Sequence, residues 1–275
     1  MKINKRIPSA FMSITSTEIN YVSDAIKNGW DKNWKKHTNK FVEKFSKYIG
    51  VKYCLPVSHC TAAIHLSLLA LDIKKGDEVI VPNLTWVACA SPILYIGAKP
   101  VFIDVDENTL CLDTNDYRKK ITKKTKAIIA VDLLGNMPNY DEIIKISKKN
   151  KIQIIEDAAE SIGAKFKNKK AGTFGNVSVF SFNATKLIMS GQGGCLCTND
   201  IKIYEKAKII ANHGIDKEKT GKYYWSTELG YNYNWTNIQA SLALAQLSRI
   251  SELLKYKKNI YKLYLKHFSK VKNVQ

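Results

Sequence analysis

Residues 127–155, AIIAVDLLGNMPNYDEIIKISKKNKIQII, contain the clearest structural pattern in the chain. Five apolar residues rich in β-branched side chains open the stretch at 127–131, helical apolar spacing follows from 140 to 149, and a short apolar run returns at 152–155. Short runs of this kind are typical of buried strands, and the segment between them suits an amphipathic helix. The stretch therefore predicts a strand, a helix and a second strand parallel to the first.

The same alternation extends toward the N-terminus. The predicted strands there are 78–81 and 100–105, and the predicted helices are 17–27, 41–49, 61–71 and 87–95. Strands that alternate with helices predict an α/β fold with a mostly parallel central sheet and helices on both faces. In such a sheet, ligands bind at the carboxyl ends of the strands.

The composition of this 275-residue chain favours a folded protein with anionic partners. Hydrophobic residues make up 45% of the sequence, and the formal net charge is +19. The lysines are spread as pairs over predicted polar turns and helix faces, so the charge suits a phosphorylated small molecule as well as a nucleic acid. Because no nucleic-acid-binding motif accompanies the charge, we expect no nucleic-acid partner.

The cysteines and the start of the chain indicate a cellular compartment. The six cysteines form no CxxC pair and have no histidine at a zinc-site spacing, so we expect reduced thiols and no metal site. The sequence opens with polar and basic residues, and its apolar runs are shorter than a membrane span. We therefore expect a cytoplasmic protein without a membrane partner.

Chemically distinctive residues follow the predicted strands 78–81 and 152–155, and also two further apolar runs that end at Val57 and Phe180. Ser58–Ala62 open a helix, Pro82–Trp86 place an aromatic ring after a strand, and Glu156–Glu160 supply carboxylates. The run VFSFNATK ends in Lys186, shortly after Ser181, and glycines at 191, 193 and 194 follow it. Because the carboxyl ends of parallel strands meet at one edge, we expect these residues to form a single site.

Pyridoxal 5'-phosphate (PLP) is a cofactor that requires all of these groups. Its phosphate suits a helix N-terminus with hydroxyls, and its ring needs a stacking face. Its pyridine nitrogen needs a carboxylate such as Asp157, and its aldehyde needs an amine such as Lys186. Once free, the same amine can move a proton between substrate and cofactor.

Each group also has a simpler interpretation when taken alone. Thr61 could cap its helix, Trp86 could belong to the core, and Asp157 could pair with a structural cation. Lys186 could be one more surface lysine among the 43 lysines and arginines. None of these interpretations predicts the four groups at one edge of one sheet.

The chain resembles the DegT/DnrJ/EryC1/StrS aminotransferases, which have the fold-type I architecture and act on nucleotide-linked keto sugars. The resemblance runs from about Ile7 to about Leu247. The motifs that carry it are GDEVIVP (76–82), GAKPVF (97–102), EDAAESIG (156–163), FSFNATK (180–186), GQGG (191–194), NHG (212–214), GYNY (230–233) and IQA (238–240). Cys60 departs from the glycine that is common in the family.

The resemblance implies a role for each matched residue. Lys186 would form the internal aldimine, Asp157 would meet the pyridine nitrogen, and Trp86 would stack on the ring. The phosphate would be held by Thr61, by the backbone at Cys60 and Ala62, by Ser181, and by Asn232 from the second subunit of a homodimer. Glu160 would lie near the cofactor.

The resemblance also implies a domain division. Residues 1–15 would form an N-terminal arm, 16–247 the PLP-binding large domain, and 248–275 the start of a C-terminal small domain. Because family members continue through that whole domain, we expect this chain to be truncated and its turnover to be impaired.

The expected function is transfer of an amino group from L-glutamate to a nucleotide-linked 4-keto-6-deoxy sugar for surface glycans such as O-antigen or capsule. The lysine favours this reaction, because the dehydratase branch of the family has histidine in its place. Alternatives are a PLP-dependent sugar dehydratase of the same family and a non-catalytic truncated partner subunit.

Overall fold

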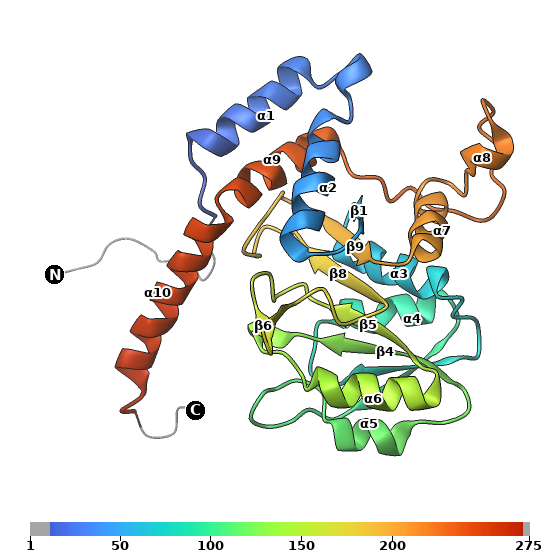
Figure 1. The fold of residues 1–275 in the computed structure, drawn as a ribbon, viewed down its shortest axis with the longest axis vertical. Helices are drawn as coiled ribbons and strands as arrows, with labels where there is room; N and C mark the ends of the chain where they lie inside the picture. Colours follow the sequence, from blue (N-terminus) through green and yellow to red (C-terminus); the bar gives the residue numbers. More distant parts are fainter. Residues whose placement is uncertain (1–11, 272–275) are drawn as a thin grey trace.

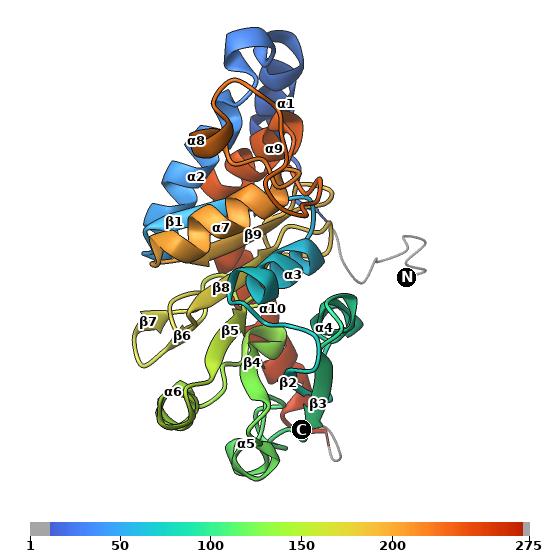
Figure 2. The ribbon, with the colours of Figure 1, turned by 90° about the vertical axis from the view of Figure 1, so that its right-hand side faces the viewer.

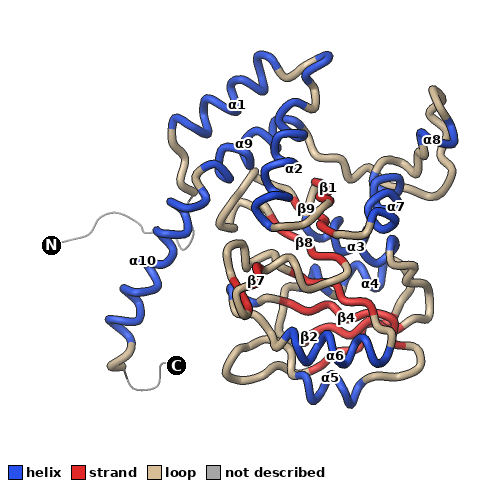
Figure 3. Tube along the Cα trace, in the orientation of Figure 1, coloured by secondary structure: helices blue, strands red, loops and turns tan. Residues whose placement is uncertain are grey.

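The structure is a computed structural model that describes residues 12–271. Most of the predicted N-terminal arm and the last four residues lie outside this range. Short strands and helices alternate along the chain, as Figure 3 shows. The strands are β1 Tyr53–Val57, β2 Glu78–Pro82, β3 Lys99–Ile103, β4 Thr125–Val131, β5 Gln153–Asp157, β6 Lys165–Phe166, β7 Lys169–Lys170, β8 Val177–Ser181 and β9 Gly194–Thr198.

The helices are more varied in length. The α-helices are α1 Ser16–Asn28, α2 Lys36–Ile49, α3 Cys60–Ala70, α4 Ser91–Tyr95, α5 Thr114–Lys120, α6 Tyr140–Asn150, α7 Ile201–Ala211, α8 Lys217–Thr220, α9 Asn237–Ser248 and α10 Ile250–Phe268. Three 3-10 turns are η1 Asp31–Asn33, η2 Val87–Cys89 and η3 Leu133–Gly135. Every helix within residues 12–271 is too short or too polar to pass through a bilayer.

A seven-stranded sheet lies at the centre of the molecule, in the order β1-β9-β8-β5-β4-β2-β3 (Figure 1). The five strands from β8 to β3 are parallel to one another. At the other edge, β9 pairs antiparallel with both β8 and β1. The predicted mostly parallel sheet is therefore confirmed, with an antiparallel edge that the periodicity did not predict.

Both faces of the sheet are covered by helices (Figure 2). In β2, Val79 and Val81 belong to the core beneath α3 and α7, whereas Ile80 belongs to the core beneath α5 and α6. A third core, beneath α2 and α9, contains an aromatic cluster around Phe45 and Phe180. Because successive residues of a strand point to opposite faces, a strand buried on both sides needs the continuous apolar run that the sequence contains.

The sequence predicts one continuous helix over 87–95, and this prediction is wrong. The structure has the turn η2 followed by the separate helix α4. Pro92 lies in the first turn of α4, the position where its missing N–H costs nothing. In the interior of one longer helix, the same proline would remove a hydrogen bond and clash with the preceding turn.

A buried carboxylate ties α1 to the junction of α9 and α10. Glu18 is 1% exposed and accepts hydrogen bonds from Arg249 Nη1 at 2.7 Å and Gln246 Nε2 at 2.8 Å. The backbone N–H and the hydroxyl of Thr15 donate to its other oxygen. Burial alone would raise the pKa of Glu18, but the hydrogen bonds from Thr15 and Arg249 lower it to about 2.

The ionised form of Glu18 therefore stabilises the fold, and this contribution depends on pH. The pKa is lower in the folded chain than its ordinary value of 4.5, so the contribution is complete above pH 4.5 and is lost as the pH falls toward 2. In urea unfolding, Glu18→Gln should be less stable than the unmutated chain at pH 7, and the difference should shrink at pH 3. A difference of the same size at both pH values would contradict this assignment.

Candidate active site

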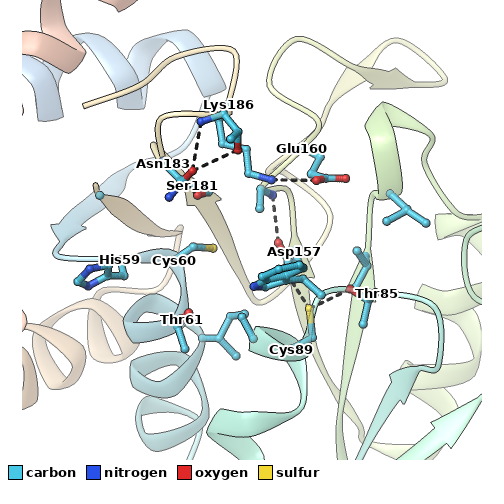
Figure 4. A pocket seen from close by; sticks show the side chains of 18 of the residues that line it. His59, Cys60, Thr61, Thr85, Cys89, Asp157, Glu160, Ser181, Asn183 and Lys186 are labelled. Atoms are coloured by element: carbon cyan, nitrogen blue, oxygen red, sulfur yellow. Dashed lines mark hydrogen bonds and ion pairs between the residues drawn. The ribbon is translucent and has the colours of Figure 1, made fainter. Parts of the chain in front are cut away.

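A cavity of about 590 Å³ opens where the carboxyl ends of β4, β5 and β8 meet the start of α3 (Figure 4). This volume lies within the range of small-molecule sites. Seven of the nine residues predicted for the site line it, namely Cys60, Thr61, Trp86, Asp157, Glu160, Ser181 and Lys186. The fold thus brings together the groups that the sequence distributes over more than a hundred residues.

Lys186 is presented by a hydrogen-bonded turn that follows β8. The hydroxyl of Ser181 accepts the N–H of Asn183, and the side-chain oxygen of Asn183 accepts the N–H of Thr185. The N–H of Lys186 then bonds to the carbonyl of Asn183 at 2.9 Å. These local bonds explain how a short polar run fixes the direction of one lysine.

Lys186 and Glu160 form an ion pair inside the cavity. Lys186 Nζ donates to Glu160 Oε1 at 2.8 Å, and the backbone N–H of Leu134 donates to Oε2 at 2.9 Å. Burial alone would raise the pKa of Glu160, but the hydrogen bonds from Lys186 and Leu134 outweigh it and leave the pKa lowered. Glu160 is therefore an anion that holds the amine toward the cavity.

Asp157 ends β5 and is 5% exposed. Its Oδ2 accepts a hydrogen bond from Cys89 Sγ at 3.0 Å, and its Oδ1 accepts the N–H of Ala159 at 3.0 Å. Burial raises the pKa of Asp157, and these two bonds together with the charge of Lys186 act in the opposite direction. The carboxyl group is thus fixed in place by donors on both oxygens.

Cys89 is a cavity residue that the sequence did not single out. Its thiol lies between Asp157 and the hydroxyl of Thr85, whose Oγ1 is 3.1 Å from Cys89 Sγ. Burial first, and then the charge of Asp157, raises the pKa of Cys89 and of Cys60 well above the usual range. Both thiols are therefore neutral, and Cys89 serves Asp157 as a donor. The sequence indicates a contact of Cys89 with Thr85 only through their spacing of four residues.

The start of α3 forms one end of the cavity. The N-cap residue His59 makes no side-chain capping bond, so the first N–H groups of the helix are left for another acceptor. Thr61 and Ser181 add hydroxyls beside them. A Cβ on Gly194 would lie 2.5 Å from the backbone nitrogen of Cys60, so only glycine permits this close approach. The arrangement is a cradle suited to a phosphate.

Trp86 lies at the rim and is not a core residue. It lines the cavity while 77% of its surface is exposed, which excludes the interpretation as ordinary core. It immediately precedes η2, so the short turn fixes the backbone beside it. An accessible indole at the rim can cover one face of a flat ring.

Two predicted residues do not line the cavity. Ala62 is buried within α3, so its predicted contribution is limited to its backbone N–H. Asn232 is exposed on the surface of its own chain, where its side-chain oxygen accepts a hydrogen bond from Asn234 at 3.2 Å. Its predicted contact with the site of a second subunit stays a prediction.

The donor set fits PLP. The start of α3 offers N–H groups and hydroxyls to a phosphate, Asp157 offers a buried carboxylate, and Lys186 offers an amine within the same cavity. A PLP-binding protein needs each of these groups. Thr61 and Asp157 therefore lie where the predicted cofactor-binding roles require them.

The glycine at the cradle gives a direct test. Gly194→Ala should push the start of α3 away from β9 and weaken PLP binding by at least about tenfold, because the new Cβ meets backbone atoms that cannot rotate away. Equilibrium dialysis of PLP measures this. Thr198→Ala, at the other end of β9 and outside the cavity, should bind PLP like the unmutated chain. Equal affinities for Gly194→Ala and Thr198→Ala would contradict the cradle.

Proteins of similar sequence or structure include sugar aminotransferases and a sugar dehydratase. GDP-perosamine synthase of Escherichia coli O157:H7 is 39% identical over 98% of this chain and 73% of its own length. The Streptococcus pneumoniae protein Spr1654, described as a sugar aminotransferase and solved in its PMP form, has a TM-score of 0.89 at 30% identity, over 97% of this chain and 72% of that one. GDP-4-keto-6-deoxymannose-3-dehydratase, solved as a mutant with bound GDP-perosamine, has a TM-score of 0.88 at 29% identity, over 96% and 74%.

The family assignment rests on the whole described chain. The DegT/DnrJ/EryC1/StrS aminotransferase profile matches residues 12–275. The PLP cofactor predicted from the sequence is confirmed, because the neighbouring structures include the PLP form of Spr1654. The chain belongs to the DegT/DnrJ/EryC1/StrS family of PLP-dependent sugar aminotransferases.

Proposed function

We propose that this protein transfers an amino group from L-glutamate to carbon 4 of a GDP-linked 4-keto-6-deoxy sugar, and that the amino sugar enters a surface glycan. The observation that carries the proposal is the placement of the Lys186 amine and the Asp157 carboxyl in one cavity with a phosphate cradle. The choice of GDP is supported by the GDP-perosamine synthases among the relatives and by the GDP-perosamine bound to a structural neighbour.

Lys186 has the position for proton transfer. When bound, PLP supplies an electron sink that permits cleavage of the C–H bond beside the substrate nitrogen. Lys186 Nζ takes up that proton and returns it to a different carbon, which converts an amine into a ketone or the reverse. The flexible side chain, 22% exposed, can leave Glu160 to do so, and Glu160 holds the ammonium form between the two transfers.

Asp157 and the α3 cradle act by binding and orientation. Asp157 keeps a proton on the ring nitrogen, and its buried position strengthens that interaction because water is excluded. Its own orientation is fixed by Cys89 and Ala159. The first N–H groups of α3 would hold the phosphate, which is the anionic end of the cofactor.

A second cavity provides room for the sugar nucleotide. It has a volume of about 430 Å³ and shares Glu160, Thr185 and Lys186 with the first cavity. Its other walls include Leu254 and Lys257 from α10. We place the sugar beside Lys186 and the diphosphate toward Lys257, whose ammonium group is the natural partner of an anion.

We further propose that the protein is a homodimer and is located in the cytoplasm. The exposed Asn232 is then available to reach the phosphate of a second subunit. The six cysteines are free thiols, which fits a reducing compartment.

The test supplies PLP, L-glutamate and GDP-4-keto-6-deoxymannose, and detects nucleotide sugars by mass spectrometry. We expect a GDP-linked amino sugar together with 2-oxoglutarate, and much less product from the UDP- and dTDP-linked keto sugars. A deoxygenated product without a sugar amine would instead identify a dehydratase. If no nucleotide sugar reacts but glutamate converts the cofactor, the acceptor class is wrong and the aminotransferase chemistry stands.

Replacing Lys186 separates its amine from its charge. Lys186→Ala should abolish the visible absorption band of lysine-bound PLP and slow amino transfer by at least about 10²-fold to 10⁴-fold, the usual contribution of a general acid–base group. Lys186→Arg keeps the ion pair with Glu160 but cannot lose a proton, so it should be equally inactive. Lys145→Ala, which removes an exposed lysine of α6, is the control and should be fully active. Activity in Lys186→Arg would refute the proton-transfer role.

Replacing Asp157 should affect rate more than binding. Asp157→Asn preserves the shape of the side chain but cannot keep the ring nitrogen protonated, so the glutamate half-reaction should slow by about 10²-fold or more. The PLP dissociation constant should change much less, because the phosphate cradle is intact. Stopped-flow absorbance and dialysis measure the two quantities. A large loss of PLP affinity at an unchanged rate would show that Asp157 serves binding only.

A further inference from the structure

Three cysteines lie together at the antiparallel edge of the sheet. Cys54 of β1 is directly opposite Cys197 of β9, and Cys195 lies two residues earlier on the same face of β9. Cys54 Sγ is 3.2 Å from Cys197 Sγ, and Cys195 Sγ is 3.7 Å from Cys197 Sγ. All three sulfur atoms lie within 4.8 Å of one another. Sequence spacing did not predict this cluster, because it forms only when β1 pairs with β9.

The cluster is separate from the active site and closed to solvent. Cys54, Cys195 and Cys197 are 1%, 0% and 1% exposed, and none of them lines the active-site cavity. Their surroundings are the apolar core that contains Phe45 and Phe180. An apolar core does not require three thiols at one point, since any small apolar residue fills the same space.

The sulfur positions match a three-coordinate metal site. With metal–sulfur bonds of about 2.3 Å, three sulfurs around one ion lie about 4 Å apart, so the Cys54–Cys197 separation of 3.2 Å must widen by about 0.8 Å and the Cys195–Cys197 separation of 3.7 Å by about 0.3 Å. The cysteines are free thiols, and a sulfur separation of 3.2 Å is too long for a disulfide bond. The described geometry is therefore closer to a metal site than to a covalent bridge.

The three sulfur donors favour some metal ions over others. Three sulfur donors without nitrogen or oxygen favour soft ions such as copper(I). Zinc structural sites almost always have four ligands, and within residues 12–271 the cluster contains only these three cysteines. The surrounding core residues are apolar, whereas the water ligand of an open zinc site needs polar partners.

We propose that Cys54, Cys195 and Cys197 form a buried site for one copper(I) ion, which joins β1 to β9. Copper stays in the +1 state throughout, and no disulfide forms. Each of the three cysteines coordinates as a thiolate, and the proton that each one loses passes to solvent. The site stabilises the sheet edge and takes no part in amino transfer.

The experiment supplies copper(I) anaerobically to the purified full chain and, because the core is closed, also to cells during expression. Bicinchoninate competes for the ion, so that only tight binding is counted. We expect one retained copper per chain, and an X-ray absorption spectrum with sulfur neighbours only, three in number. Cys197→Ala should bind at least about 100-fold more weakly, and Cys111→Ala, a buried cysteine outside the cluster, should bind like the unmutated chain.

Several results would overturn the site. Copper that is lost in Cys89→Ala but kept in Cys197→Ala would place the ion in the active site. Zinc(II) bound in preference to copper(I) would contradict the choice of metal, and a loss of two hydrogens in the intact mass would identify a disulfide instead. If circular dichroism shows that Cys197→Ala does not fold, the X-ray absorption spectrum of the unmutated chain tests the proposal instead. Nitrogen or oxygen neighbours in that spectrum refute the proposal.

Discussion

The buried carboxylate of Glu156 is the interaction on which the active-site edge depends. It accepts backbone N–H groups from Gly172, Phe174 and Gly175, the loop that leads into β8. Burial raises the pKa of Glu156 to about 7, against the opposing effect of these donors. A buried acid satisfied by one loop conformation specifies that conformation, because any other would leave it without partners. The loop therefore delivers β8 beside β5, and the strand ends that carry Ser181 and Asp157 meet.

The local parts of the fold could be predicted from the sequence. The run from Ala127 to Ile155 forms β4, α6 and β5 with shifts of only one or two residues at most ends, because hydrophobic period and length are local properties. The same pattern predicts Asp157 and Lys186 after strands, which is why the sequence could predict that most of these residues would line one cavity. Pro92 was overlooked, although the rule that separates η2 from α4 is also local.

The remaining features depend on contacts between distant segments. Gly194 begins β9, where its lack of a side chain permits the close approach to α3. Cys89 donates a hydrogen bond to Asp157, which lies 68 residues further along the chain. Hydrophobic periodicity predicts neither feature, because both depend on how close one element lies to another in space.

The neutral thiols in the cavity have a chemical consequence for the cofactor. Cys60 and Cys89 lie in the same cavity as Lys186, for which we propose contact with the cofactor aldehyde, and aldehydes are open to attack by sulfur nucleophiles. The thiolate, not the thiol, is the reactive species, and the raised pKa of both groups keeps them protonated at neutral pH. Burial, reinforced by the charge of Asp157, thus suppresses ionisation of these two sulfurs, which leaves the amine of Lys186 as the nucleophile available to an aldehyde in this cavity.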